Sequence, residues 1–284
     1  MKIGAHVSAA GGVDKAIDRA VEIGAETIQV FAGPPQVWRR KRYQPPEIRT
    51  YQARVAETGI APTFLHGVYL VNLATSNPEF LAKSYEALVH EMTACHDLGA
   101  AGVIFHIGSH KGSGYESCFR QVVEYVAKII EATPEDANLV LENSAGMGGT
   151  IGSKFAELGQ IIREVGSPRV QVCLDTQHAF ASGYDLKTRP GTDAAMAEFE
   201  REIGLDRLVA VHANDSKCAL GGALDRHENI GQGHIGRDGF ENMMAHAAFA
   251  DVPFLLEVPG ADNQGPDKAN VDELKAIRAT ALKA

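Results

Sequence analysis

The sequence predicts a (β/α)8 barrel, in which eight parallel strands alternate with helices. Short apolar runs recur along the chain, and each is followed by an amphipathic segment of helical period. The 284 residues, 45% of them hydrophobic, are enough for one large core and fall within the length range of such a barrel. A single domain over residues 1–284 is therefore expected, with a doubly wound open sheet as the weaker alternative.

Eight apolar runs mark the expected strands. In chain order they cover residues 3–7, 27–31, 63–66, 103–106, 139–142, 170–175, 208–212 and 254–257. The segments between them are typical of helices. Residues 77–97 have Asn77 as a cap and Pro78 at the first helical position. Asp238 and Glu241 have the spacing of a capping box for a later helix.

Composition narrows the class of protein. The formal charge of −9 argues against a nucleic-acid partner unless bound divalent cations offset the carboxylates. No apolar run approaches the roughly 18 residues of a membrane span, and the N-terminus leads into a strand rather than a signal peptide. The four cysteines are scattered and form no CxxC pair. We expect a soluble, cytoplasmic monomer with reduced thiols.

A glycine-rich stretch near the C-terminus matches a nucleotide-binding pattern in letters only. Residues 231–236, GQGHIG, fit the dinucleotide fingerprint, but that motif needs a strand running directly into its first glycine. Residues 225–229 are charged and are predicted to form a loop. No organic cofactor is therefore expected.

The same stretch offers metal ligands. His212 ends an apolar strand, and Asp225 and His227 follow in the loop, where residues two apart in an extended segment point to the same side. A metal site is one interpretation, and a polar surface loop is the other.

Ionisable residues end six consecutive strands, and this favours the metal interpretation. They are His66, His106, Glu142, Asp175, His212 and Glu257. In a barrel these positions meet at the C-terminal face, where clustered carboxylates repel unless cations hold them. With His178, Asp225 and His227 they make nine candidate ligands. A single ion needs three or four, so nine indicate two or three ions; imidazoles and carboxylates without thiolates suit zinc first, then manganese or iron. His6, His110 and His234 lie near the expected mouth and are candidates to orient these ligands.

Four motifs resemble the endonuclease IV family of apurinic/apyrimidinic endonucleases. They are HVSAAGG (6–12), LDTQHAFASGYD (174–185), HANDSK (212–217) and DRHENIGQGHIG (225–236), and the likeness runs essentially end to end. Gln177, Ile107 and Val258 stand where that family frequently has Cys, Pro and Thr, and none of them replaces a ligand.

The resemblance implies three zinc ions and assigns all nine ligands. Glu142, Asp175, His212 and Glu257 would hold one ion, His66 and His106 a second bridged through Glu142, and His178, Asp225 and His227 the third. Glu142 and Glu257 would be the catalytic carboxylates. The implied reaction is hydrolysis of the phosphodiester 5′ to an abasic site in duplex DNA, which leaves a 3′-hydroxyl and a 5′-deoxyribose phosphate.

The resemblance also implies DNA contacts near the second and third strands. Tyr69 and Leu70 match side chains that family members insert at the lesion, and Gln36 stands where an Arg is usual. The densest basic run of the chain follows at residues 39–42, and we expect Arg39 and Arg40 within it to contact phosphates.

Two other functions stay open. A sugar isomerase or epimerase with a related barrel would use one metal ion on Glu142, Asp175, His212 and Glu257, which leaves the other five candidate ligands unexplained. A catalytically silent binder of damaged DNA would carry structural metals only, although structural zinc sites usually close all four positions with protein ligands.

Overall fold

Eight parallel strands close into a barrel in the computed structural model, which describes residues 1–38 and 42–283. The barrel strands are β1 (Ile3–His6), β2 (Ile28–Phe31), β3 (Thr63–His66), β4 (Gly102–His106), β5 (Leu139–Glu142), β6 (Val170–Asp175), β7 (Leu208–His212) and β10 (Phe254–Leu256). They follow the order β1-β10-β7-β6-β5-β4-β3-β2 around the barrel. The predicted (β/α)8 fold is thus confirmed. An open sheet is excluded, because β1 pairs with β10 as well as with β2.

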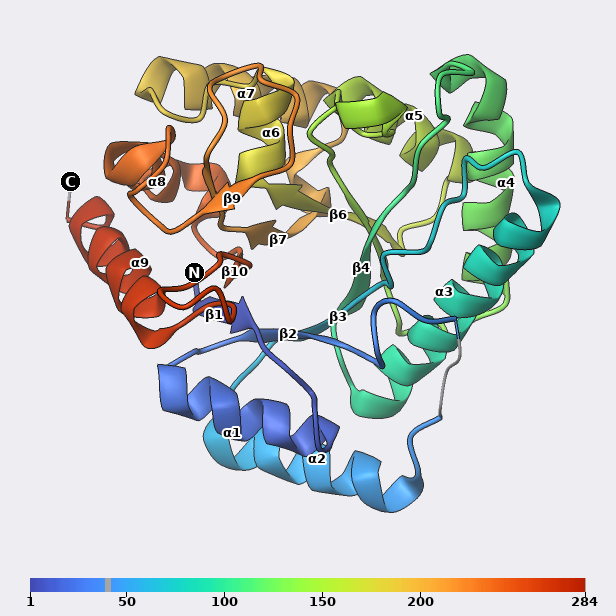
Figure 1. Ribbon diagram of the computed structural model, residues 1–284, viewed down its shortest axis with the longest axis horizontal. Coiled ribbons are helices and arrows are strands. Elements are labelled where there is room, and N and C mark those ends of the chain that lie inside the picture. The colour runs from blue at the N-terminus through green and yellow to red at the C-terminus, as the bar shows by residue number, and fades with distance from the viewer. Residues whose placement is uncertain (39–41, 284) are drawn as a thin grey trace.

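Helices surround the barrel on the outside (Figure 1). They are α1 (Val13–Ile23), α2 (Pro45–Thr58), α3 (Pro78–Leu98), α4 (Tyr115–Glu131), α5 (Phe155–Val165), α6 (Thr176–Ser182), α7 (Arg189–Glu202), α8 (Gly236–Met244) and α9 (Lys268–Ala281), with short 3-10 turns η1 (Met147–Gly149), η2 (Leu205–Arg207) and η3 (Ala247–Phe249). Within the described part of the chain, no helix combines the length and apolar character that crossing a membrane requires.

The start of α3 confirms the sequence prediction, and the start of α8 corrects it. The Asn77 side chain accepts hydrogen bonds from the backbone N–H groups of Glu79 and Phe80, as expected of an N-cap. In α8 the residue before the helix is Ile235, and no side chain of its own turn caps it, so the predicted capping box is wrong. The Asp215 carboxylate accepts from the first N–H of this helix instead, which leaves that donor no need of a local cap.

Two short strands were not predicted. β8 (Asp215–Ser216) and β9 (His227–Glu228) pair antiparallel at the mouth of the barrel and are separate from it. Part of the segment expected to be a loop is therefore extended. The pairing turns the chain back on itself after β7, so that residues well beyond His212 in sequence return to the same mouth.

A layer of apolar side chains fills the barrel directly below the strand ends. Its members are Phe64, Ile104, Val140, Cys173, Ala210 and Leu255, one each from β3, β4, β5, β6, β7 and β10, and none is more than 1% exposed. Each of them lies two residues before one of the six ionisable residues that end these strands. Because side chains two apart in a strand point the same way, those six point toward the barrel axis above an apolar floor.

Candidate metal centre

The six ionisable strand ends converge at the mouth of the barrel, as the register requires. Opposite neighbours in the sheet include His106 with Glu142 and Asp175 with His212. Glu142, Asp175 and His212 are fully buried. Such carboxylates lie next to imidazoles rather than water, which is an arrangement that needs either protons or cations between them.

The remaining three candidate ligands reach the mouth from outside the strands. The Asp175 side chain accepts from the His178 backbone N–H at 2.8 Å and so caps α6, which brings the His178 ring back over the strand ends. His227 begins β9, and Asp225 lies in the irregular segment just before it. All nine predicted ligands therefore lie at one mouth.

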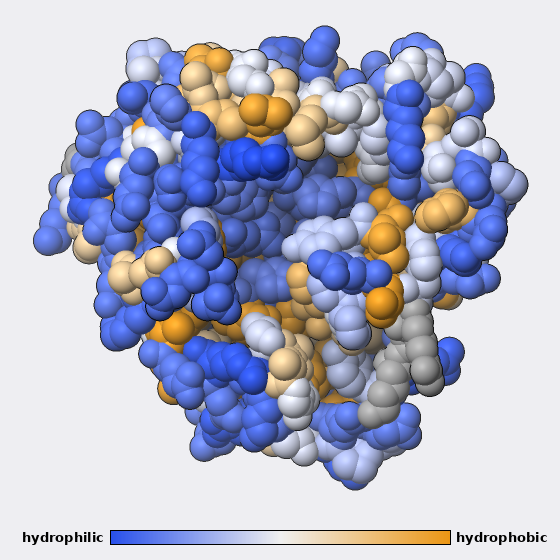
Figure 2. Space-filling view, in the orientation of Figure 1, coloured by the Kyte–Doolittle hydropathy of each residue, from blue (hydrophilic) through white to orange (hydrophobic). Residues whose placement is uncertain are grey.

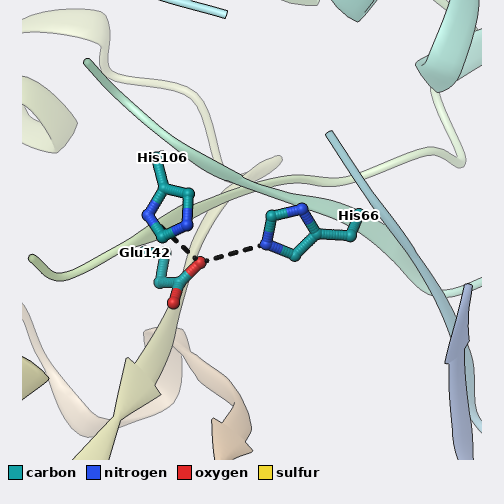
Figure 3. Close-up of side chains that lie close together, drawn as sticks. All are labelled: His66, His106 and Glu142. Atoms are coloured by element: carbon teal, nitrogen blue, oxygen red, sulfur yellow. Dashed lines mark hydrogen bonds and ion pairs between the residues drawn. The ribbon is translucent and has the colours of Figure 1, made fainter. Parts of the chain in front are cut away.

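The first group joins two imidazoles to one carboxylate oxygen (Figure 3). His66 Nε2 lies 3.3 Å and His106 Nδ1 3.6 Å from Glu142 Oε2. His66, His106 and Glu142 together offer ligand atoms that all lie within 4.8 Å of one another, which is close enough for one metal ion.

The second group surrounds His212. Its Nδ1 lies 3.0 Å from Glu142 Oε1, 3.3 Å from Glu257 Oε2 and 3.9 Å from Asp175 Oδ2. These four residues offer a second set of mutually close ligand atoms. Glu142 thus presents one oxygen to each group, which is the geometry of a bridging carboxylate.

The third group differs slightly from the one that the family resemblance implies. Its mutually close atoms belong to Asp175, His178 and His227. Asp225 lies beside them, with one oxygen 3.3 Å from His178 Nε2 and the other 3.4 Å from His227 Nε2. Asp175 therefore lies between the second and third groups, as Glu142 lies between the first and second.

The imidazole tautomers suit metal ligation. The Nδ1 atoms of His66, His178 and His227 lie 2.6, 3.0 and 3.2 Å from backbone carbonyl oxygens. A carbonyl oxygen only accepts, so in each neutral imidazole Nδ1 carries the proton and Nε2 has the lone pair. The Nε2 atoms of His178 and His227 are buried and have no hydrogen-bond partner among the described residues. Two buried lone pairs facing one carboxylate fit a cation, and the residues present therefore suit metal ions.

The carboxylates are held in the form that binds cations. Burial alone would raise the pKa of Glu142, but the imidazoles of His106 and His212 hold it well below its usual range. The pKa of Glu257 is likewise held low, because its imidazole neighbours outweigh burial. Burial of Asp225 is outweighed in the same way, and its pKa falls to about 2. At neutral pH these groups are ionised.

The mouth opens into a hollow with a volume of about 900 Å³. Figure 2 shows this hollow lined by hydrophilic residues, with apolar patches on parts of its rim. Its lining runs from His66, His106 and Asp225 to the loops after β1 and β2. A hollow of this size and polarity accepts a small polar group that projects into it.

Of the predicted DNA contacts that the structure describes, Tyr69 lines this hollow. Tyr69 is 60% exposed, and its ring packs edge-on against Phe31, 5.2 Å between centroids. Leu70 is half-buried and Gln36 is exposed. Arg39 and Arg40 lie outside the described residues.

Several polar residues that orient the ligands were missed or only partly anticipated. His6 contacts Glu257 at 3.2 Å, as expected, whereas His110 accepts from the glycine N–H groups of its own loop and His234 is exposed. Gln29, Asn143 and Asn214 were missed. Asn214 donates to Asp175 at 2.7 Å and accepts from the Glu257 backbone N–H at 2.8 Å. The available signal was a buried amide in or beside an apolar strand.

The glycine-rich loop wraps a side chain of the protein itself. The Asp215 carboxylate is fully buried and accepts from the backbone N–H groups of Gly231, Gly233 and Ile235 at 2.9 to 3.0 Å. A Cβ at position 233 would lie 2.5 Å from an Asp215 oxygen, so only glycine fits there. The loop thus holds an internal anion, which accounts for its resemblance to a phosphate-binding motif.

The fold and site define a TIM-barrel protein with imidazole and carboxylate groups suited to several metal ions. A family model described as "Xylose isomerase-like TIM barrel" matches residues 17–280. The "Probable endonuclease 4" of Methanoculleus marisnigri is 39% identical over 97% of this chain and 98% of its own length, and that of Halorhodospira halophila is 43% identical over 91% and 88%. The crystal structure of endonuclease IV from Thermus thermophilus superposes with a TM-score of 0.87 at 31% identity, covering 100% of both chains. The chain belongs to the endonuclease IV family.

Another solved structure shares the fold alone. A D-tagatose 3-epimerase-like protein covers the whole chain with a TM-score of 0.74, at 18% identity. Shared architecture at this level of identity carries no activity with it.

Proposed function

We propose that this protein is a DNA-repair endonuclease that hydrolyses the phosphodiester 5′ to an abasic site in duplex DNA, leaving a 3′-hydroxyl and a 5′-deoxyribose phosphate. The observation that carries the proposal is the chain of three ligand groups at one mouth, joined by the shared carboxylates of Glu142 and Asp175. Family membership supports the same reaction.

Three divalent ions, zinc first and manganese or iron as alternatives, would occupy the three groups. Glu142, Asp175, His212 and Glu257 would hold one ion, and His66 and His106 would hold the second with Glu142. His178, Asp225 and His227 would hold the third, with the Asp175 carboxylate close by. When bound, such ions activate water and neutralise charge that develops on the attacking and leaving oxygens of a phosphoryl group.

The protein's own residues position the catalytic carboxylates and exclude bulk water. Glu142 ends β5 and Glu257 directly follows β10, and both carboxylates face His212 Nδ1. They are the carboxylates that we assign to catalysis. The apolar floor below them keeps bulk water out from underneath. No protein nucleophile is required. An abasic nucleotide is already unpaired, so turning it toward the hollow costs little stacking energy.

The two alternative functions explain fewer of these contacts. An isomerase needs the second group only and gives no role to His66, His106, His178, Asp225 or His227. A silent binder with structural metals gives no reason for a hollow that opens onto the ligands. We propose one barrel domain over residues 1–284 that acts as a monomer on duplex DNA in the cytoplasm, without an organic cofactor.

The deciding experiment uses the purified protein and a duplex with one abasic analogue. Elemental analysis should find close to three zinc-class ions per chain, and the duplex should be cut once, on the 5′ side of the analogue. Dialysis against a chelator should abolish cutting, and added metal should restore it. A single ion per chain together with no cutting would overturn the proposal and favour an isomerase.

A further inference from the structure

Gln29 lies beneath the candidate metal centre and contacts two of its proposed ligands at once. Its side chain is fully buried in β2, level with Phe64 of the apolar floor. Its amide nitrogen lies 2.7 Å from Glu257 Oε1, and its amide oxygen lies 2.8 Å from His212 Nε2. These partners are 228 and 183 residues away in sequence, so one side chain links β2 with the ends of β10 and β7.

The chemistry of Glu257 decides which way the Gln29 amide faces. An ionised carboxylate only accepts hydrogen bonds, so the Gln29 atom beside it must be the NH2 group. The amide oxygen therefore faces His212 and accepts from its Nε2–H. A neutral imidazole carries one proton, which leaves the lone pair on His212 Nδ1. That atom is the one that faces Glu142 and Glu257, at 3.0 and 3.3 Å.

We propose that Gln29 is a positioning residue for the metal ion of the second group. It selects the tautomer in which His212 Nδ1 can bind the ion, and it holds the Glu257 carboxylate toward the same point. This inference rests on the proposed function, because it assumes that the second group binds a metal ion.

Three other imidazoles of the site are oriented by the backbone, whereas His212 is not. His66, His178 and His227 are oriented by backbone carbonyl oxygens, which no substitution removes. His212 is oriented by a side chain that lies on the barrel floor. Partners that orient ligands in this way typically contribute about 10- to 100-fold to metal affinity or activity.

The test compares Gln29→Met with wild type and with Gln121→Met. Methionine keeps the length of the side chain and removes its hydrogen bonds. Gln121 is a matched control, because its amide donates two hydrogen bonds to the backbone carbonyls of Leu73 and Thr75, away from the metal centre. Metal affinity is measured by competition with a zinc chelator, and unfolding of the metal-free proteins reports their stability.

We expect Gln29→Met to bind one of its three ions about 10- to 100-fold more weakly, so that it retains two ions under chelator conditions in which wild type and Gln121→Met retain three. In the metal-free protein, at a pH high enough for the His212 imidazole to be neutral, long-range 1H–15N spectra should place the His212 proton on Nε2 in wild type and show a mixture of tautomers in Gln29→Met. A role in packing alone would lower metal-free stability and move neither of these readings.

A second variant covers the case in which Gln29→Met does not fold. Gln29→Asn keeps the amide but is one methylene too short to join both partners, so it should show the same selective loss of one ion. Wild-type affinity and an unchanged His212 tautomer in a folded Gln29 variant would overturn the inference. Absence of metal binding by wild type would overturn the proposed function instead, so the two failures are distinguishable.

Discussion

The two carboxylate oxygens of Glu257 make different contacts. One carboxylate oxygen accepts from Gln29 at 2.7 Å, and the other lies 3.3 Å from His212 Nδ1. In Glu257→Gln the amide oxygen can still accept from Gln29, which turns the NH2 group toward the metal position. We expect the fold and much of the DNA affinity to persist, and cleavage of an abasic duplex to fall by at least about 100-fold.

The matched control for this substitution is Glu228→Gln. Glu228 lies next to His227 in β9, but its carboxylate faces Lys217, 3.9 Å away, and accepts from a backbone N–H. Its cleavage rate should stay near wild type. A Glu257→Gln protein with a near wild-type single-turnover rate would show that the role assigned to Glu257 is wrong.

Tyr69 is the described residue best placed to contact a lesion. It is largely exposed at the rim, while its ring edge is held by Phe31. We expect Tyr69→Ala to weaken binding to an abasic duplex and to leave binding to an intact duplex nearly unchanged, because stacking at the lesion is lost and phosphate contacts are not. Fluorescence titration of both duplexes measures this. Leu282→Ala, which removes an exposed side chain in the C-terminal turn, is the control. Equal losses on both duplexes would contradict an insertion role.

At the scale of elements, strand ends were predictable because two signals coincide there. An apolar run gives the strand, and the ionisable residue that ends it faces the axis for the same reason as the apolar residue two positions earlier. The positions of His66 and Glu142 could therefore be predicted without knowledge of tertiary contacts. The registers of β4 with β5 and of β6 with β7 then place neighbouring ends opposite each other, His106 with Glu142 and Asp175 with His212.

Other elements depend on contacts that a sequence pattern does not contain. β8 and β9 are two residues each and polar, so no periodicity marks them. The start of α8 is capped by Asp215, 21 residues away, and local spacing at Asp238 suggested the wrong partner. Gln29 is a single polar residue in a strand, and its role depends on side chains 183 and 228 residues away in the chain.

Glu26, which lies just before β2, links the start of β1 to helix α9. Its carboxylate accepts from the Arg278 guanidinium of α9 at 2.6 and 3.0 Å and from the Ile3 backbone N–H of β1 at 2.8 Å. Burial would raise its pKa, but Arg278 and the Ile3 N–H lower it to about 2, from a usual 4.5. The folded pKa is depressed, so the stabilisation is complete above about pH 4.5 and is lost as the pH falls toward 2.

We therefore expect Glu26→Gln to lower the free energy of unfolding by about 1 kcal/mol at pH 7, a modest value because the side chain is 33% exposed. The deficit relative to wild type should shrink as the pH is lowered from 4.5 to 2. Urea titrations of the metal-free proteins measure both. Glu57→Gln, whose exposed carboxylate pairs with Arg54 on its own helix, should change stability by less than about 0.5 kcal/mol at any of these pH values. A constant deficit at all pH values would contradict the ionic role.

At the scale of the whole molecule, an acidic protein must hold a polyanion. Three divalent ions would add six positive charges to the formal −9, which still leaves the sum negative. Affinity for duplex DNA then has to come from a local basic surface. The run Arg39, Arg40, Lys41 and Arg42 is the densest such segment in the sequence, and it follows the strand that carries Gln29.

Replacing these four residues by Gln should weaken binding to abasic and intact duplexes alike. The slope of log affinity against log salt concentration should flatten by up to about 4 units, because each lost phosphate contact removes close to one released counterion. Binding isotherms at several salt concentrations give the slope. A variant that neutralises the exposed residues Lys128, Arg189, Arg201 and Lys268 on α4, α7 and α9 is the control. An unchanged slope would mean that the phosphate contacts lie on other loops.

The glycine-rich loop has a consequence for protein engineering. Asp215 supplies the anion that its N–H groups surround, so Asp215→Ala should leave a carboxylate-shaped space lined by donors. Formate has the shape and charge to occupy that space. Its addition should raise the unfolding midpoint of Asp215→Ala with the logarithm of formate concentration and leave wild type unchanged, with chloride as the ionic-strength control. Formate would then be a small ligand that stabilises the folded barrel of this variant.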